Sequence, residues 1–521
     1  MKRLAPLLAT AGLLAGSLPF LTAAPAAADP AVQEYRPAKP AWHRCSAEQP
    51  ASYECATLTV PLDYRQPRGR TLDLAISRVK SPDPAKRHGV LLMNPGGPGG
   101  PGLDLPLTAG AALPPEVREQ YDLIGFDPRG VGASSPVGCG LTDAEKEFQR
   151  AYRPEAFPSD VAWARTVADK CREKAGAVLP YITTRNTARD MDAIRSVLGE
   201  RRISYLGYSY GTYLGAVYTQ MFPSRTDRFV LDSAVDPQRI WRGMLQVWAS
   251  EAEPAFARWT RWTAERDAEY HLGATPEAVS ATFWGLVARA DRDPVEFQGQ
   301  KITGDDIRRG RPLFFSPAQA APALSALKAA ADGTPPPQGL AVPDVRAALR
   351  GSAEPPSDNA TAVFWSVVCG DTDAWPRDPE QYRRDAERDK ARYPLYGDMA
   401  SNIKPCAFWQ RPAEAATPMR TRADALTVQN EWDSQTPLVS GLGLHSVLRG
   451  SRMVLARGGE GHTVYLSEPG SCVNAPVTSY LATGRLPARD VACTTVPAPD
   501  RRREARPGGE PLPLPAGPQR F

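Results

Sequence analysis

Signatures of several common protein classes are absent from this sequence. It contains no H-E-x-x-H motif, no G-x-x-x-x-G-K-[ST] motif and no pair of cysteines spaced C-x-x-C. These absences remove the support for a zinc protease, a P-loop nucleotide-binding protein and a thioredoxin-like redox protein. We therefore expect a protein that needs no metal and no cofactor.

An excess of charge of one sign is also absent. The chain has 62 basic and 58 acidic residues, a net charge of +4, which gives no reason to expect binding to nucleic acid or to a membrane surface. Beyond the N-terminal segment, no stretch approaches the ~20 apolar residues needed to cross a bilayer. We expect a monomer without nucleic-acid or membrane partners.

The N-terminal segment has the three parts of a secretory signal peptide. Lys2 and Arg3 form a short positive region, an apolar stretch covers residues 4–21, and a run of small residues ends at Ala28. A membrane anchor is the alternative, but prolines and glycines interrupt the apolar stretch, and its small-residue end favours cleavage. We predict a signal peptide over residues 1–28 and a secreted, extracellular mature protein.

Export makes the cysteines informative, because disulfides form in oxidising compartments. There are eight cysteines, and they fall into four couples along the sequence. Eight cysteines allow about 105 pairings, and some free buried thiols are an alternative. Pairing between neighbours is the simplest hypothesis, and it gives Cys45–Cys55, Cys139–Cys171, Cys369–Cys406 and Cys472–Cys493.

Short apolar runs alternate with helical patterns on both sides of the middle of the chain. The segment 186–198 has helical spacing, with Met191, Ile194 and Val197 on one face. Alternating strands and helices predict an α/β protein with a mainly parallel central sheet. The runs that predict buried strands lie at residues 89–93, 121–126, 203–206, 228–231, 425–430 and 452–456.

Residues 240–400 differ from this pattern. They contain helical stretches rich in Trp, Ala and Arg, and we find no run of short buried strands there. A mostly helical cap inserted into an α/β core is the simplest interpretation. The predicted divisions are a core over 41–239, a cap over 240–405 and the rest of the core over 406–496, with a propeptide or disordered arm over 29–40 and a disordered tail over 497–521.

The strongest local motif is Gly207-Tyr208-Ser209-Tyr210-Gly211, a G-x-S-x-G sequence. A predicted strand leads into it and a predicted helix leads out of it, which is the setting of a nucleophile elbow in an α/β-hydrolase. A chance match in a loop would lack this setting. The motif therefore predicts that Ser209 is a nucleophile and that its reaction is acyl transfer.

A serine hydroxyl needs a base, usually a histidine oriented by a carboxylate, and this fold places them in the order Ser, acid, His. The order excludes the two histidines before Ser209. His271 lies in the helical block and His445 within a predicted helix, whereas His462 lies in a glycine-rich loop after a strand. We predict His462 as the base among the five histidines of the chain, His43, His88, His271, His445 and His462.

The acid is expected just after the strand predicted at 425–430. Asp433 follows that strand and precedes a helix, while Glu431 is the rival acid at the same strand end. A turn or helix-start aspartate is the structural alternative for Asp433. We predict Asp433 as the catalytic acid.

Two backbone amides are needed to stabilise the oxyanion. One is expected from Tyr210, directly after the nucleophile, and the other from Gly97 in the glycine-rich loop 96–102. That loop also matches G-x-G-x-x-G, and Asp122 follows at the spacing of a dinucleotide-binding acid. Pro98 and Pro101 lack amide hydrogens and no good helix start follows the loop, which disfavours that interpretation.

Together these motifs resemble the tripeptidyl-aminopeptidase branch of the prolyl-aminopeptidase-like α/β-hydrolases, from residue 42 to residue 495. The resemblance implies Ser209, Asp433 and His462 as the triad, Gly97 and Tyr210 as the oxyanion hole, and the same couples of cysteines. The motifs that carry it are 60–64, Val-Pro-Leu-Asp-Tyr; the loop 94–102; 125–134, Gly-Phe-Asp-Pro-Arg-Gly-Val-Gly-Ala-Ser; 207–211; Asp433 with Thr436-Pro437; and Gly461-His462.

One position departs from the related prolyl aminopeptidases, which carry His-Gly-Gly-Pro-Gly where this chain has Pro95 in place of the histidine. The resemblance thus implies release of tri- or tetrapeptides from free N-termini of peptides, with cleavage after proline as one form of that specificity. Asp371 and Asp373 are candidates to bind the substrate ammonium, although ordinary loop acids beside a cysteine are the simpler interpretation. A secreted esterase or lipase with the same triad, or an inactive binding scaffold, remain alternatives.

Overall fold

The computed structural model describes residues 35, 37–335, 357–468 and 470–494. The predicted signal peptide 1–28 and tail 497–521 therefore lie outside the described residues, as does most of the predicted arm 29–40. No helix among the described residues combines the length and the apolar character needed to cross a membrane.

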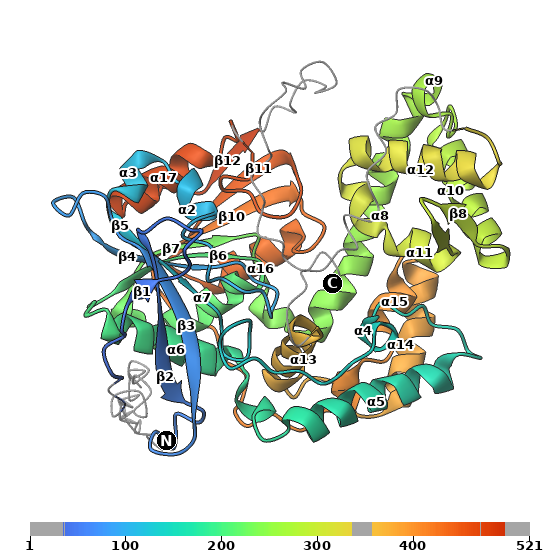
Figure 1. The fold of residues 1–521 in the computed structure, drawn as a ribbon. Helices are drawn as coiled ribbons and strands as arrows, with labels where there is room; N and C mark the ends of the chain where they lie inside the picture. Colours follow the sequence, from blue (N-terminus) through green and yellow to red (C-terminus); the bar gives the residue numbers. More distant parts are fainter. Residues whose placement is uncertain (1–34, 36, 336–356, 469, 495–521) are drawn as a thin grey trace, which may run out of the picture.

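A ten-stranded sheet forms the centre of the core (Figure 1). The strand order is β1-β2-β3-β5-β4-β6-β7-β10-β11-β12; pairing is antiparallel from β1 to β5 and parallel from β5 to β12. The α/β prediction with a mainly parallel sheet is confirmed. The strands are β1 His43–Arg44, β2 Tyr53–Pro61, β3 Thr71–Val79, β4 Gly89–Asn94, β5 Tyr121–Phe126, β6 Ile203–Tyr208, β7 Thr226–Asp232, β10 Ala425–Trp432, β11 Arg452–Glu460 and β12 Val491–Thr494.

Helices cover both faces of the sheet. Successive side chains of a strand point to opposite faces, so each strand contributes to the packing on both sides. On β4, Val90 and Leu92 belong to the apolar cluster that includes α6, α7 and α16, whereas Leu91 and Met93 belong to the cluster that includes α3 and α17. Both faces are thus buried, as expected for parallel strands. The core helices are α2 Ala109–Ala112, α3 Pro115–Arg118, α6 Thr184–Val197, α7 Tyr210–Met221, α16 Leu438–Val447 and α17 Asn474–Thr483.

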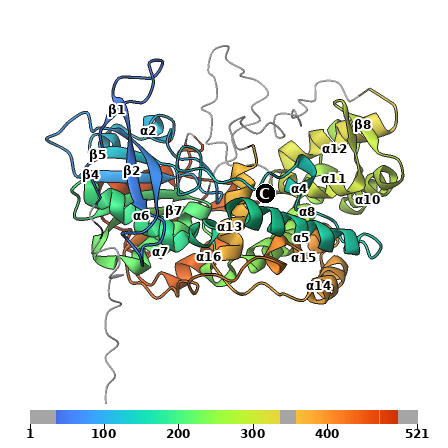
Figure 2. The ribbon, with the colours of Figure 1, turned by 60° about the horizontal axis from the view of Figure 1, so that its bottom comes forward.

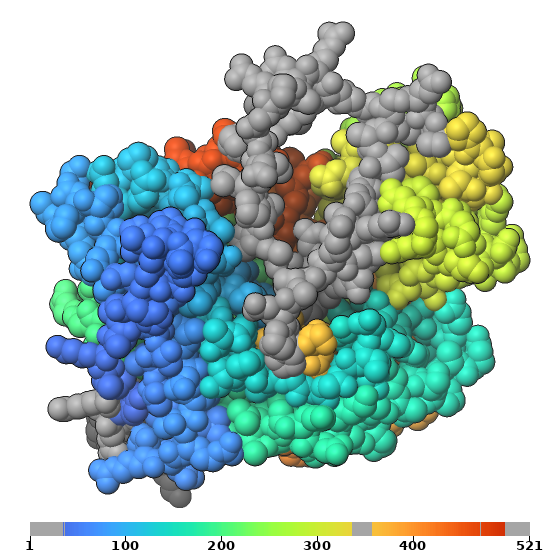
Figure 3. Space-filling view, in the orientation of Figure 1, coloured from blue at the N-terminus to red at the C-terminus, as the bar shows by residue number. Residues whose placement is uncertain are grey.

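A mostly helical cap lies beside the sheet, in green, yellow and orange in Figure 1 and on the right of Figure 3. Its aromatic centre packs Phe256 against Phe283 and Phe314, with ring centroids 4.9 and 5.1 Å apart. A two-stranded hairpin, β8 Val295–Phe297 and β9 Gln300–Ile302, interrupts the helices. It is short and only Val295 in it is buried, so among the described residues this block holds one exposed hairpin but no run of buried strands. The cap helices are α8 Arg242–Ala264, α9 Asp267–Tyr270, α10 Pro276–Arg292, α11 Gly304–Arg309, α12 Pro317–Ala331, α13 Asn359–Gly370, α14 Pro379–Arg392 and α15 Gly397–Ser401.

A segment that precedes the nucleophile also joins this helical layer. It contains α4 (Asp143–Lys146) and α5 (Phe157–Ala175), and α5 lies beside α15 in both ribbon views (Figures 1 and 2). Tyr152 donates to Glu387 (2.7 Å), and Lys404 donates to the carbonyl of Phe148 (3.1 Å). The helical layer is therefore built from two stretches of chain, and the division expected at residue 239 describes only the second of them.

Four disulfides connect the eight cysteines, in the pairs expected from the sequence. Cys139–Cys171 fastens α5 to the segment before it, and Cys369–Cys406 fastens the end of α13 to the chain that returns to the core. The longest loops that they close thus belong to the helical layer.

Candidate active site

Ser209 lies at the sharp turn between β6 and α7. Its backbone has φ 55° and ψ −123°, a strained conformation for a residue with a side chain. β6 ends at Tyr208 and α7 begins at Tyr210, so the predicted strand–serine–helix order is present. The turn aims the first amides of α7 toward the site, where they favour negative charge.

The glycine-rich loop after β4 packs directly against this turn. A Cβ added to Gly96 would lie 2.5 Å from the Tyr208 carbonyl oxygen and 2.9 Å from the Ser209 Cβ, and its φ is +98°, so only glycine fits. The Asn94 side chain accepts the Gly96 amide (3.0 Å). The structure thus brings the loop that holds Gly97 next to Ser209 and Tyr210.

Asp433 and His462 are in contact at the same edge of the sheet. The His462 Nδ1 atom lies 2.9 Å from each carboxylate oxygen of Asp433. Asp433 also accepts the amides of Gln435 (2.8 Å) and Thr436 (2.9 Å) and the Thr436 hydroxyl (2.9 Å). The carboxylate is fully buried and the imidazole side chain is 25% exposed, so the acid is fixed while the other edge of the ring remains accessible.

The pKa values of this pair move in the directions expected of an acid that orients a base. Burial raises the pKa of Asp433, but the His462 charge and the hydrogen bonds from His462, Thr436 and Gln435 outweigh it, and the net pKa is below its ordinary value. Burial lowers the pKa of His462, but the charges of Asp433 and Asp232 outweigh it, and the net pKa is raised. The ion pair is therefore favoured over the neutral pair.

The two described side chains of Ser209 and His462 do not form a direct hydrogen bond. Both residues are instead linked through Asp232. The Ser209 amide donates to the Asp232 carbonyl (2.9 Å), and the Val464 amide, two residues after His462, donates to the Asp232 carboxylate (3.0 Å). Catalytic hydrogen bonds are often long before substrate binds. The nucleophile turn and the loop that carries His462 thus both hydrogen-bond to Asp232.

Two polar residues that sequence analysis missed support the base loop. The Asn430 amide donates to the carbonyls of Glu460 (3.1 Å) and Gly461 (3.0 Å), and Asp232 lies beneath the residues after His462. Both stand at or near the carboxyl end of a strand predicted from the sequence. A polar side chain at the carboxyl end of a parallel strand could have indicated a residue of the site, because sites of α/β proteins lie at that edge of the sheet.

Three side chains of the cap contact the two loops that carry the acid and the base. The Trp248 indole donates to the Gln435 carbonyl (2.6 Å), and the Arg311 guanidinium donates to the Ser434 carbonyl (2.9 Å). Arg258 pairs with Glu460 and lies 4.5 Å from the Trp432 ring centroid. The cap thus braces both loops from one side.

The rival residues have other partners. Glu431 accepts the Gly458 amide (2.6 Å), and His445 contacts Ser451 (2.7 Å) and Asp490 (3.1 Å). His88 pairs with Asp227 at 2.6 Å, at the opposite end of β7. Among the described carboxylates and histidines, Asp433 and His462 form the pair that lies at the nucleophile edge.

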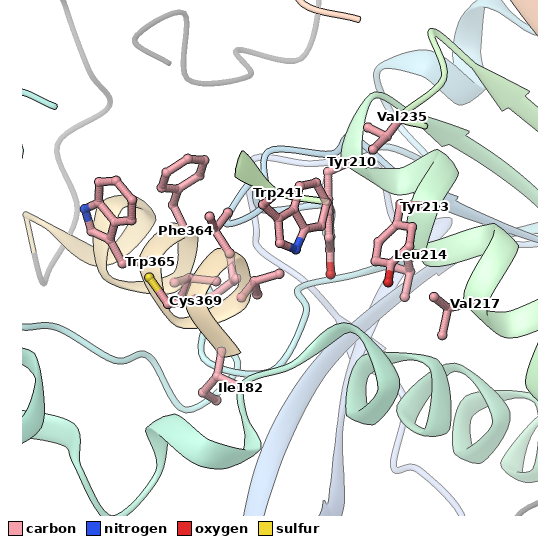
Figure 4. Packing of buried hydrophobic residues seen from close by; sticks show 14 of the residues in the cluster. Ile182, Tyr210, Tyr213, Leu214, Val217, Val235, Trp241, Phe364, Trp365 and Cys369 are labelled. Carbon is pink, nitrogen blue, oxygen red and sulfur yellow. The ribbon is translucent and has the colours of Figure 1, made fainter. Parts of the chain in front are cut away.

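The two aspartates suggested for ammonium binding each contact other side chains of the protein. Asp371 is buried and accepts from the Thr184 amide (2.8 Å), the Thr184 hydroxyl (2.6 Å) and the Trp241 indole (3.3 Å). Figure 4 shows that Trp241 lies beside Tyr210, whose hydroxyl is 2.8 Å from that of Thr184. Asp373 pairs with Arg377 and Arg411. These contacts are those of anchoring side chains, and the assignment of Asp371 and Asp373 to ammonium binding stays a prediction.

A strained serine between strand and helix, with a buried carboxylate bonded to an imidazole at the same edge of a mainly parallel sheet, defines a serine hydrolase with the α/β-hydrolase fold. Two family models match, one described as alpha/beta hydrolase fold over residues 89–298 and one as TAP-like protein over residues 393–493. The tripeptidyl aminopeptidase of Streptomyces lividans is 37% identical, over 87% of this chain and 86% of that protein.

Two mycobacterial proteins are also similar. Serine protease Hip1 of Mycobacterium tuberculosis is 29% identical, over 87% of this chain and 90% of that protein. Carboxylesterase B of the same species is 30% identical, over 84% of this chain and 86% of that protein. The chain belongs to the tripeptidyl aminopeptidase family of α/β-hydrolases, and it is a serine peptidase.

Proposed function

We propose that this protein is a secreted exopeptidase that releases tri- or tetrapeptides from peptides with a free N-terminus. The observation that carries the proposal is the Asp433–His462 contact of 2.9 Å at the edge where Ser209 holds its strained turn. The named activity of the Streptomyces relative supports the substrate class. The four disulfides and the signal-peptide pattern of residues 1–28 support secretion.

The proposed mechanism is two-step acyl transfer. His462 takes the proton of the Ser209 hydroxyl while the Ser209 Oγ atom attacks the scissile carbonyl carbon. The backbone amides of Gly97 and Tyr210 donate hydrogen bonds to the oxyanion that forms. His462 then gives its proton to the leaving amine, and the carbon–nitrogen bond breaks. In the second step His462 takes a proton from a water molecule, whose oxygen attacks the acyl carbon. His462 then gives this proton to the Ser209 Oγ atom as the ester carbon–oxygen bond breaks, which releases the short peptide with a new carboxyl group and restores the serine. Asp433 holds the imidazole in the required tautomer throughout.

A panel of chromogenic substrates tests the reaction class. Tripeptide amides ending in Ala or Pro, the same amides with an acetylated N-terminus, and short acyl esters are compared on the purified protein. We expect turnover of the free tripeptide amides and a loss of turnover on acetylation. Ser209→Ala is expected to abolish turnover with an unchanged melting temperature, while Ser446→Ala, an exposed serine on α16, serves as the matched control.

An esterase is the second candidate, because the Carboxylesterase B relative is 30% identical over 84% of this chain. The catalytic groups alone do not separate the two reactions, since the same triad serves both. Rapid ester turnover without any amide cleavage would support the esterase and contradict the peptidase proposal. A wild-type protein that no fluorophosphonate probe labels at Ser209 would leave only a binding scaffold.

A further inference from the structure

Three backbone amides follow His462 outside any helix or strand, and each one has a side-chain acceptor. The Thr463 amide donates to the Ser233 hydroxyl (2.8 Å), and the amides of Val464 and Tyr465 donate to the Asp232 carboxylate (3.0 and 2.7 Å). Backbone amides in a protein interior need acceptors. Two consecutive side chains at the end of β7 therefore hold the backbone of the base loop.

Asp232 also lies between the strands that lead to the other two members of the triad. It pairs in register with Tyr208 on β6, directly before Ser209, and with Val428 on β10. Its carbonyl accepts the Ser209 amide (2.9 Å). One residue thus contacts the backbone of the nucleophile turn with its main chain and the base loop with its side chain.

The Asp232 carboxylate has no cationic partner other than the nearby imidazole among the described residues. It is fully buried, and the titratable groups that face it are His462 from the base loop and Tyr208 from β6. Burial raises its pKa to about 7, against the hydrogen bonds from Tyr465, Val464 and Ser233. Its negative charge in turn raises the pKa of His462.

We propose that Asp232 is a positioning residue for His462, which fixes the base loop through its two amide contacts and favours the imidazolium through its negative charge. This inference rests on the proposed function, because it assigns His462 as the base. A purely structural aspartate would hold the loop without influencing how the imidazole binds its proton. The two roles therefore differ in the pH dependence of the reaction.

Four variants separate these effects. Asp232→Asn keeps an oxygen that accepts the amides but removes the charge, while Asp232→Ala removes both. Ser233→Ala removes the contact with Thr463 and the hydrogen bond from the Ser233 hydroxyl to Asp232 (3.1 Å), but it keeps the carboxylate. Asp227→Asn is the matched control, because Asp227 lies at the opposite end of β7 and contacts His88 (2.6 Å).

The measurement is the rate of inactivation by a fluorophosphonate as a function of pH, with a thermal melt of each variant. This probe depends on Ser209 and its base but not on any peptide specificity. In the profile of inactivation rate against pH, we expect the acid limb, where the rate falls as the pH drops, to lie at lower pH in Asp232→Asn, because the imidazole loses a neighbouring negative charge. The rate on the plateau above this limb is expected to stay within about tenfold of wild type. We expect a plateau loss of about 100-fold in Asp232→Ala, since a small misplacement of a catalytic group has an effect of that size.

Ser233→Ala is expected to slow inactivation by about threefold to tenfold and to move the acid limb less than Asp232→Asn does, because the carboxylate is kept. The Asp227→Asn profile is expected to match wild type. The inference is overturned if the limb of Asp232→Asn stays in place or moves to higher pH, or if that variant does not fold. If wild type itself is not labelled at Ser209, the proposed function fails and the inference fails with it. Labelled wild type with an unmoved Asp232→Asn limb overturns the inference alone.

Discussion

Asp433 and Glu431 stand two positions apart after the same strand, and the structure gives them different partners. Asp433 contacts the His462 ring, whereas Glu431 accepts the Gly458 amide. We predict that Asp433→Asn lowers kcat about 10⁴-fold, because an amide that faces the imidazole favours the wrong tautomer. Glu431→Gln, the matched control, is expected to stay within about threefold of wild type in steady-state kinetics. A larger loss in the Glu431 variant would exchange the two roles.

The pH dependence of kcat/KM is expected to follow His462. Only the neutral imidazole accepts the serine proton, so the rate falls as the pH drops through the pKa of that group in the free enzyme. Asp433 and Asp232 raise this pKa above its ordinary value of 6.5. The midpoint of the acid limb is therefore predicted above pH 6.5, and a tripeptide amide assayed across the pH range measures it. A midpoint below that value would contradict the arrangement.

The individual residues differ in how far sequence alone could assign them. Ser209 stands in a motif, and His462 and Asp433 follow from the order of the triad and the strand ends, so all three could be predicted. Asp232 carries no motif, and its partner amide in Val464 is 232 positions away. Contacts at that separation depend on the assembled sheet, which is why this residue was missed.

At the scale of elements, helix α8 connects the cap to both catalytic loops. Arg258 pairs with Glu460, two residues before His462, and lies over the Trp432 ring, one residue before Asp433. We predict that Arg258→Met lowers kcat/KM about tenfold, because small displacements of oriented groups have effects of that order or more. Steady-state assays on a tripeptide amide test this.

Arg261 provides the control on the same helix, since its side chain is exposed. Arg261→Met is expected to match wild type in both rate and melting temperature. If the Arg258 and Arg261 variants have equal kinetics, the cap does not brace the loops through this residue.

The elements beside the site could be predicted better than those of the cap. Buried parallel strands are recognisable as short apolar runs, and β4, β6, β10 and β11 were all located from them. The hairpin of β8 and β9 is short and packs on the cap rather than in a main sheet, so its pattern is weak. Helix α5 could not be assigned to the helical layer, because its position depends on contacts such as that of Tyr152 with Glu387.

For the whole molecule, the disulfides are expected to contribute to stability in the order of the loops they close. Cys369–Cys406 spans 37 residues and Cys45–Cys55 spans 10. Loop-closure entropy predicts that removing the first by paired Cys→Ser substitutions lowers the free energy of unfolding by about 4 kcal/mol, and removing the second by about 3 kcal/mol. Denaturant unfolding under non-reducing conditions measures both. A loss below about 1 kcal/mol for the longer loop would contradict this assignment.

The cap and the core both contact the elements that carry the catalytic groups. The cap contacts the loop that carries Asp433 through Trp248 and Arg311, and the glycine-rich loop packs against the nucleophile turn. The proposed length of the released peptide rests on the 37% identity to the tripeptidyl aminopeptidase of Streptomyces lividans.

Mass spectrometry of the products from one defined peptide of about twelve residues tests the central claim most directly. The account predicts that wild type releases a tri- or tetrapeptide from the free N-terminus, leaves the acetylated peptide intact, and loses this activity in Ser209→Ala. Internal cleavage, release of single residues, or equal cleavage of the acetylated peptide would contradict it.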